Sequence, residues 1–161
     1  MLASCQNKQQ ETTDVCTQQE NQVVATIMER RSIRKYKPQP VEREKMDLIL
    51  KCGINAPNGQ NKQSWEVRVV DNPAFMAEIK EAMAQGHPDM DSEMVKGCFR
   101  GAPTMVFIAR AKSYDFSAYD CGLMAENMML SAQALGVGSI CLGSPVRFIN
   151  DSPSCAPIHE R

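Results

Sequence analysis

The pattern of apolar positions predicts two short amphipathic helices near the start of the chain. Apolar residues recur every three or four positions over 22–31 and again over 41–52, as one face of a helix requires. Pro38 and Pro40 lie between these segments and exclude a continuous helix, because proline lacks the backbone N–H that a helix interior needs. The first helix is therefore expected to end near Arg31, and an extended segment to follow it.

Runs of β-branched and apolar residues predict three strands. The run Trp65 to Val70 is followed by Asn72-Pro73, an N-cap and a first-turn proline that predict a helix to about Gln85. Thr104 to Ala109 is continuously apolar, which predicts a central strand buried on both faces. Residues 138–143 predict a short third strand that ends at a glycine.

The segment 119–135 carries apolar residues around most of its circumference, which predicts a widely buried helix. Gly136 follows it in a position that favours a helix C-terminal cap. Residues 55–64 and 86–101 have no hydrophobic period and are rich in turn formers. Both are therefore predicted to be mainly loop.

Length and composition fit one globular domain over 22–161. The 161 residues are 43% apolar, and a formal net charge of -1 gives no general basic field for nucleic acid or an anionic bilayer. The seven cysteines form no CxxC pair and are accompanied by two histidines, so neither a zinc nor a thioredoxin-like site is indicated. Cys52, Cys121 and Cys141 lie in apolar stretches and are expected to be buried thiols.

Residues 1–21 are predicted to form a disordered polar tail or tether. Leu2-Ala3-Ser4-Cys5 resembles a bacterial lipobox, whose cysteine is lipidated after a signal peptide is removed. Lipidation of Cys5 would place the protein at the cell envelope, and it would be the only membrane attachment, since no run approaches the roughly 20 apolar residues of a span. The alternative is an ordinary flexible tail on a cytoplasmic protein, because the charged and apolar parts of a signal peptide are not seen.

A basic segment follows the first predicted helix. Arg30, Arg31 and Arg34 place three guanidinium groups around Ser32, and guanidinium groups bind phosphate oxygens through paired hydrogen bonds. The alternative is a solvated cluster, which the helix dipole favours at a C-terminal end. The basic segment alone does not separate these two interpretations.

The loop at 58–63 carries side-chain amides beside Gly59. Alternating amide donors and acceptors suit the polar edge of a heteroaromatic ring, whereas the alternative is a plain polar turn. The basic segment and this loop together favour a ligand that has both an anion and a planar polar ring. No catalytic triad or acid-base pair is recognisable, so no catalytic residue is assigned.

The sequence resembles the FMN-dependent nitroreductase family in four ordered blocks, over roughly 23–148. The blocks are Arg30-Arg31-Ser32-Ile33-Arg34-Lys35-Tyr36, Ala56-Pro57-Asn58-Gly59-Gln60-Asn61-Lys62-Gln63-Ser64-Trp65, Gly101-Ala102-Pro103, and a helix from Asp120-Cys121-Gly122 to Leu135-Gly136-Val137-Gly138-Ser139. The resemblance implies an α+β fold, with a mixed sheet flanked by helices. It also implies an intertwined homodimer whose core holds the helix 119–135.

The resemblance further implies an FMN site shared between two subunits. The cofactor-binding residues it implies are Arg30, Arg31, Ser32, Arg34, Pro57, Asn58, Gly59, Asn61, Gln63, Leu142 and Gly143. The basic segment would contact the FMN phosphate and ribityl chain, and Asn61 and Gln63 would face the flavin. Residues 57–59 would reach the flavin bound mainly by the other subunit, and the backbone of 142–143 would lie near the ring.

The activity implied by the resemblance is hydride transfer from NADH or NADPH through FMN to a nitroaromatic, a quinone or a similar acceptor. The flavin carries that chemistry. One alternative is a non-catalytic flavin-binding or tethered interaction protein, and another is a flavin dehalogenase or dehydrogenase of the same superfamily.

The chain departs from the family pattern in two places. Ser64 stands where the family usually has proline before the tryptophan. The family's further C-terminal strand, with a Gly-Tyr-Pro-like segment and a basic residue, is not found in this sequence. The domain is therefore expected to be C-terminally shortened, and its sheet to expose an unpaired edge.

Overall fold

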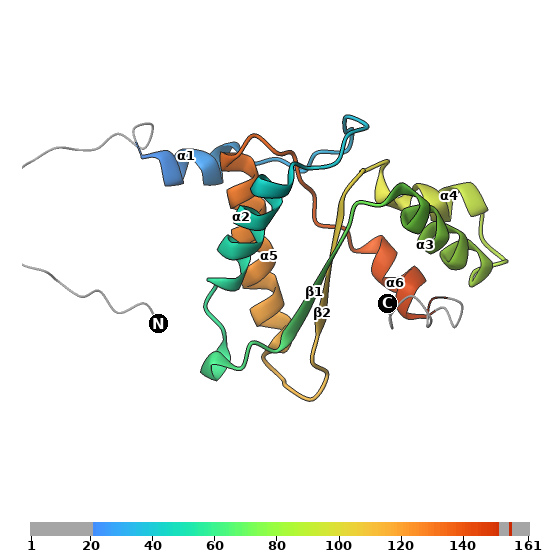
Figure 1. Cartoon of the computed structure of the whole chain (residues 1–161). Coiled ribbons are helices and arrows are strands. Elements are labelled where there is room, and N and C mark those ends of the chain that lie inside the picture. Colours follow the sequence, from blue (N-terminus) through green and yellow to red (C-terminus); the bar gives the residue numbers. More distant parts are fainter. Residues whose placement is uncertain (1–20, 152–154, 156–161) are drawn as a thin grey trace, which may run out of the picture.

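The computed structural model describes residues 21–151 and residue 155. Helices flank a two-stranded antiparallel sheet, which confirms the predicted α+β class (Figure 1). The elements are α1 (Gln22–Glu29), α2 (Arg43–Ile54), η1 (Gly59–Asn61), β1 (Trp65–Val70), α3 (Pro73–Gln85), α4 (Ser92–Lys96), η2 (Gly97–Phe99), β2 (Met105–Arg110), α5 (Ser117–Ala134) and α6 (Ser144–Asn150). Residues 1–20 of the predicted tail over 1–21, including the lipobox-like residues 2–5, lie outside the described residues.

Two asparagines fix the starts of α1 and α3. The Asn21 side chain accepts hydrogen bonds from the backbone of Val23 and Val24, at 3.0 and 3.2 Å. The Asn72 side chain accepts from Ala74 and Phe75 in the same way, at 2.9 and 3.1 Å. Each side chain satisfies N–H groups that have no partner inside the helix, which confirms the predicted helix starts.

The sheet is a ribbon of β1 and β2 in antiparallel register, from Trp65 opposite Arg110 to Val70 opposite Met105. Alternate side chains along a strand point to opposite faces. The strand residues are accordingly divided between two cores, with 65, 67, 106 and 108 packed against one and 70, 105 and 107 against the other. The ribbon thus connects the two halves of the domain.

The first core lies between α3, α4, η2 and α6, and the second lies between α2, α5 and the ribbon (Figure 1). The buried residues of the first are Val70, Met76, Ile79, Met83, Val95, Cys98, Phe99 and Cys155. Those of the second are Ile49, Ala56, Met124, Met128 and Ala132. The second core holds the helices that carry the candidate site.

The helix α5 contributes a single buried stripe, made of Ser117, Asp120, Met124, Met128 and Ala132. Tyr119 and Leu123 on it are exposed and Met129 and Leu130 are half-buried, so the predicted wide burial is wrong for a single chain. Helix α2 packs closely on the stripe through Gly53, where an added Cβ would lie 2.7 Å from Cγ of Met128. Gly136 caps the helix with a φ of 71°, as predicted, because glycine adopts this left-handed conformation readily.

The strand β2 is not a central strand buried on both faces. Among the described residues it pairs only with β1, its first four residues are half-buried, and Ala109 and Arg110 are exposed. The apolar run of the sequence indicates a strand but not how many strands lie beside it. That number depends on other segments of the molecule.

Two further local predictions are wrong. Residues 86–101 include α4 and η2, since the Asp91 side chain accepts a hydrogen bond from Met94 N at 2.8 Å and the segment buries Val95 and Phe99. Residues 138–143 form no strand beyond a parallel bridge between Ser139 and Ser32. In the described residues this bridge is parallel, whereas β1 and β2 pair antiparallel. Helix α6 begins five residues after it.

The prediction that Cys52, Cys121 and Cys141 are buried thiols is wrong. Cys52 and Cys121 are half-buried and Cys141 is exposed, whereas Cys98 and Cys155 are buried. Within residues 21–151 and 155, no cluster of three or more His, Cys, Asp or Glu side chains could hold a metal ion. No helix in the same part of the chain has the length and apolar character needed to cross a membrane.

Candidate functional site

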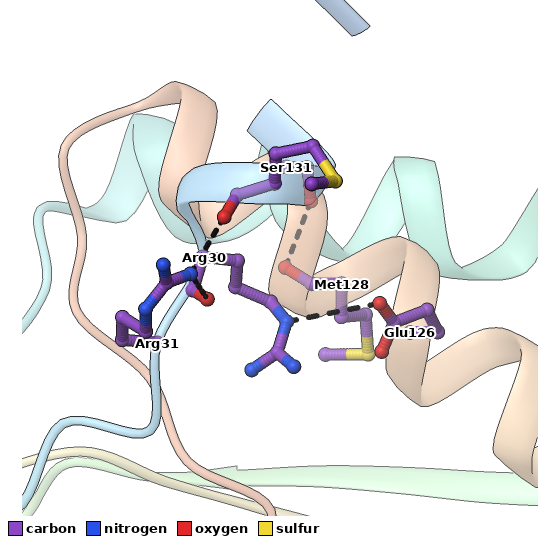
Figure 2. A network of polar contacts seen from close by, with 6 residues as sticks. Arg30, Arg31, Glu126, Met128 and Ser131 are labelled. Atoms are coloured by element: carbon purple, nitrogen blue, oxygen red, sulfur yellow. Dashed lines mark hydrogen bonds and ion pairs between the residues drawn. The ribbon is translucent and has the colours of Figure 1, made fainter. Parts of the chain in front are cut away.

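The basic segment begins where α1 ends, and two of its arginines are held by the protein itself (Figure 2). Nη1 of Arg31 donates to the carbonyl oxygens of Met28 and Arg30, at 2.6 and 2.8 Å. Nε of Arg30 lies 3.8 Å from Oε1 of Glu126 on α5. Arg31 therefore caps the end of α1, which is the structural role expected of a cation there. The Arg30 side chain contacts α5 through Glu126.

The next residues run beside the segment that follows α5. Ile33 N donates to Ser139 O at 3.0 Å, and an added Cβ on Gly138 would lie 3.0 Å from Cγ1 of Ile33. The chain reaches Leu142 three residues after Ser139. The structure therefore places Ser32 and Ile33 beside Ser139, three residues before the predicted 142–143 segment, in which Leu142 is half-buried and Gly143 is exposed.

Tyr36 fixes the end of the basic segment. Its hydroxyl donates to Ile33 O at 2.6 Å, while Nη1 of Arg34 donates to Ser32 O at 3.2 Å. Burial raises the pKa of the Tyr36 hydroxyl above its ordinary value, although the nearby Arg34 guanidinium opposes that shift. The hydroxyl thus stays protonated at neutral pH and can keep donating.

The three guanidinium groups retain hydrogen-bonding capacity for a ligand. Each carries five N–H donors, and the contacts described above use Nε of Arg30 and one terminal nitrogen each of Arg31 and Arg34. Arg31, Ser32 and Arg34 are exposed and Arg30 is half-buried. An anion could therefore approach all four residues from solvent.

The loop that contains η1 has an unusual backbone. Gln60, Asn61 and Gln63 all have positive φ angles, at 55°, 52° and 48°, although none is glycine. The Asn58 side chain closes the loop by accepting a hydrogen bond from Gln63 N at 3.0 Å. Asn61 and Gln63 are exposed, so their amides are available to a ligand.

The loop is attached to α5 through Asp120, whose importance the sequence reasoning missed. The Asp120 carboxylate accepts hydrogen bonds from Gly59 N at 3.0 Å and from the Ser64 hydroxyl at 3.3 Å, and Asp120 is 3% exposed. Tyr114 lies over Gly59, and Nζ of Lys62 lies 4.3 Å from the centre of the Tyr114 ring. The signal that could have revealed Asp120 is its spacing, because it lies four residues before Met124 and eight before Met128, on the buried face of α5.

The basic segment and the loop lie at opposite ends of α5 (Figure 1). The loop is bonded to Asp120 in the first turn, whereas Ser32 pairs with Ser139, beyond the last turn. The 15 residue steps from Asp120 to Leu135 span about 22 Å at the rise of an α-helix. One chain therefore does not bring the predicted phosphate-binding and ring-facing residues into one place.

Gly59 is expected to tolerate no larger residue while Tyr114 stays in place. A Cβ at this position would collide with the Tyr114 hydroxyl, so Gly59→Ala should lower the free energy of unfolding by about 1–3 kcal/mol. Tyr114→Phe should recover most of the loss, because the next ring atom, Cζ, would be 3.2 Å from the new methyl group. Urea unfolding of the two single variants and the double variant measures this. An equal loss in both Tyr114 backgrounds would contradict the proposed collision.

Known proteins match both the sequence and the fold. Residues 27–148 match the family model described as "Nitroreductase family". A protein of Archaeoglobus fulgidus, whose name combines NADH dehydrogenase and NAD(P)H nitroreductase, is 32% identical over 121 residues, which is 73% of this chain and 64% of that protein. The FMN reductase [NAD(P)H] of Bacillus subtilis is 28% identical over 137 residues, covering 77% of this chain and 55% of that protein.

Solved structures extend the similarity to the arrangement of the elements. A Bacteroides fragilis nitroreductase with bound FMN superposes with a TM-score of 0.77 at 26% identity, covering 87% of this chain and 79% of that one. A nitroreductase of Desulfitobacterium hafniense with bound FMN gives 0.77 at 28% identity, covering 88% and 80%. The chain spans a little over half to about two thirds of the curated relatives named above. Because the family model covers most of the chain, the chain belongs to the nitroreductase family.

Proposed function

We propose that this chain binds FMN and acts as an NAD(P)H-dependent flavin oxidoreductase. The observation that carries the proposal is the basic segment, where three arginines with spare guanidinium donors and Ser32 lie within residues 30–34, next to the chain that leads to Leu142. Relatives named for FMN reduction and solved relatives with bound FMN support the same assignment.

The donor set of this segment suits the FMN phosphate. Guanidinium groups give charge-assisted hydrogen bonds to phosphate oxygens, and the Ser32 hydroxyl adds another donor. Arg30 and Arg34 are the main candidates, because Arg31 already caps α1 through two carbonyl groups. The exposed Asn61 and Gln63 amides would then orient the polar edge of the flavin ring.

The site is proposed to form between two copies of the chain. The separation of the two segments along α5 supports this arrangement, since the loop that would meet the ring lies far from the basic segment of its own chain. Exposed apolar residues support a homodimer as well. On α5, Tyr119 is 71% and Leu123 46% exposed, and on α1 Val23 is 67% and Met28 66% exposed.

Bound FMN would accept a hydride from NADH or NADPH and pass the electrons to a nitroaromatic, a quinone or a similar acceptor. The residues of this chain would hold the phosphate through Arg30 and Arg34 and orient the ring through Asn61 and Gln63. No side chain of the described region is assigned a proton-transfer role.

The test is to add FMN to the purified protein and follow flavin fluorescence, then to add NADPH or NADH with a quinone acceptor. We expect saturable binding followed by acceptor-dependent oxidation of the nicotinamide. Protein that fails to bind FMN would contradict the proposal. Flavin that binds but is not bleached by either nicotinamide would instead support the non-catalytic flavin-binding alternative.

A further inference from the structure

The two oxygens of the Asp120 carboxylate hold the two ends of the loop from Gly59 to Ser64. Oδ1 accepts from Gly59 N at 3.0 Å, and Oδ2 accepts from the Ser64 hydroxyl at 3.3 Å. Asp120 is 3% exposed and sits in the first turn of α5, on the buried stripe of that helix. A single buried side chain thus connects both ends of the loop to the main helix of the second core.

The loop needs such an attachment because its backbone is strained. Three of the four residues 60–63, namely Gln60, Asn61 and Gln63, have positive φ angles, a region that L-residues rarely occupy. The bond from Gln63 N to the Asn58 side chain closes the loop on itself but does not connect it to α5. A backbone contact with the residue after β2, Ala111 N donating to Ser64 O at 2.9 Å, fixes the end of the loop but not its start.

Ser64 holds the end of the loop through its side chain, because its hydroxyl donates to Asp120. A proline at this position would remove that donor.

From these contacts we infer that Asp120 and Ser64 are positioning residues for flavin binding. They hold the loop in the shape that presents the amides of Asn61 and Gln63, and they do not touch the cofactor themselves. The inference rests on the proposed function for its flavin part. The holding of the loop by Asp120 is testable without flavin.

Trypsin reports on the loop directly, because Lys62 lies at its exposed centre. In the full chain, Asp120→Ala should speed cleavage after Lys62 by about tenfold relative to cleavage after Lys51 in α2, since both hydrogen bonds are lost. FMN affinity should fall by a similar factor. Asp120→Asn should remain near the unchanged protein in both measurements, because an amide can accept from Gly59 N and bond to the Ser64 hydroxyl.

Two further variants complete the test. Ser64→Ala removes one of the two bonds and should give a smaller change in the same direction, and it serves in place of Asp120→Ala if that variant does not fold. Asn127→Ala is the matched control on α5, since Asn127 donates to Cys52 O at 3.1 Å and does not contact the loop. It should leave the ratio of the two cleavage rates unchanged.

The outcomes separate the two proposals. Unchanged cleavage after Lys62 in both Asp120→Ala and Ser64→Ala would overturn the inference, as would an Asp120→Asn variant as sensitive as Asp120→Ala. Faster cleavage after Lys62 in a protein that never binds FMN would confirm the attachment of the loop, and it would remove the flavin role together with the proposed function.

Discussion

Replacing Arg30 and Arg34 together by alanine is expected to weaken FMN binding by about 100- to 10,000-fold. Each charge-assisted hydrogen bond to phosphate contributes about 1.5–3 kcal/mol, and every 1.4 kcal/mol corresponds to about a tenfold change in the dissociation constant. The cost in stability should be small, because the Arg30 contact with Glu126 is 3.8 Å long and partly exposed. Flavin fluorescence titration measures the affinity, and far-UV circular dichroism checks the fold.

Arg43→Ala is the control for loss of positive charge. Arg43 is highly exposed and pairs with Asp47 one turn further along α2. Its removal should leave FMN affinity within about twofold of the unchanged protein, because exposed charges at a distance are largely screened by salt. An Arg30 and Arg34 double variant that binds as well as Arg43→Ala would exclude the basic segment from the site.

Phe99→Ala is expected to lower the free energy of unfolding by about 3–5 kcal/mol, the cost of truncating a fully buried phenylalanine. Phe99 is 0% exposed and meets Phe107 edge to face, with ring centres 6.1 Å apart. For a domain of this size, such a loss should lower the melting temperature by roughly 6–20 °C. Differential scanning calorimetry gives the value.

Met94→Ala provides the comparison for Phe99. Met94 lies on the neighbouring α4 and is 54% exposed, so its truncation should change the free energy of unfolding by less than about 0.5 kcal/mol. Similar losses in the two variants would show that the first core does not stabilise the domain as its packing indicates.

Local signals explain which parts of the fold were predictable from sequence. Asn72 and Pro73 predicted the start of α3, since cap hydrogen bonds join neighbours in the chain. The same kind of signal was present at Asp91, yet the surrounding Gly, Pro and Asp residues favoured a loop over the five-residue helix α4. Residues 138–143 contain strand-forming residues, but a strand also needs a partner along its length, and only Ser139 has one.

The candidate site likewise has a part that the sequence predicts and a part that it does not. The basic segment and the amide-rich loop are each a single short stretch of the chain, so the chemistry of each could be predicted from the sequence. The role of Asp120 could not, because it depends on hydrogen bonds to Gly59 and Ser64, residues 61 and 56 positions away. The position of the loop at the far end of α5 is likewise a tertiary feature.

A mixing experiment tests the shared FMN site most directly. One partner carries Arg30→Ala and Arg34→Ala, the other carries Asn61→Ala and Gln63→Ala, and the two are refolded together from denaturant. If each site takes the basic segment from one chain and the loop from another, each mixed dimer regains one intact site, and roughly a quarter of all sites should bind FMN at full affinity. If each site is built within one chain, no mixture would regain full-affinity binding, and the shared site would be contradicted.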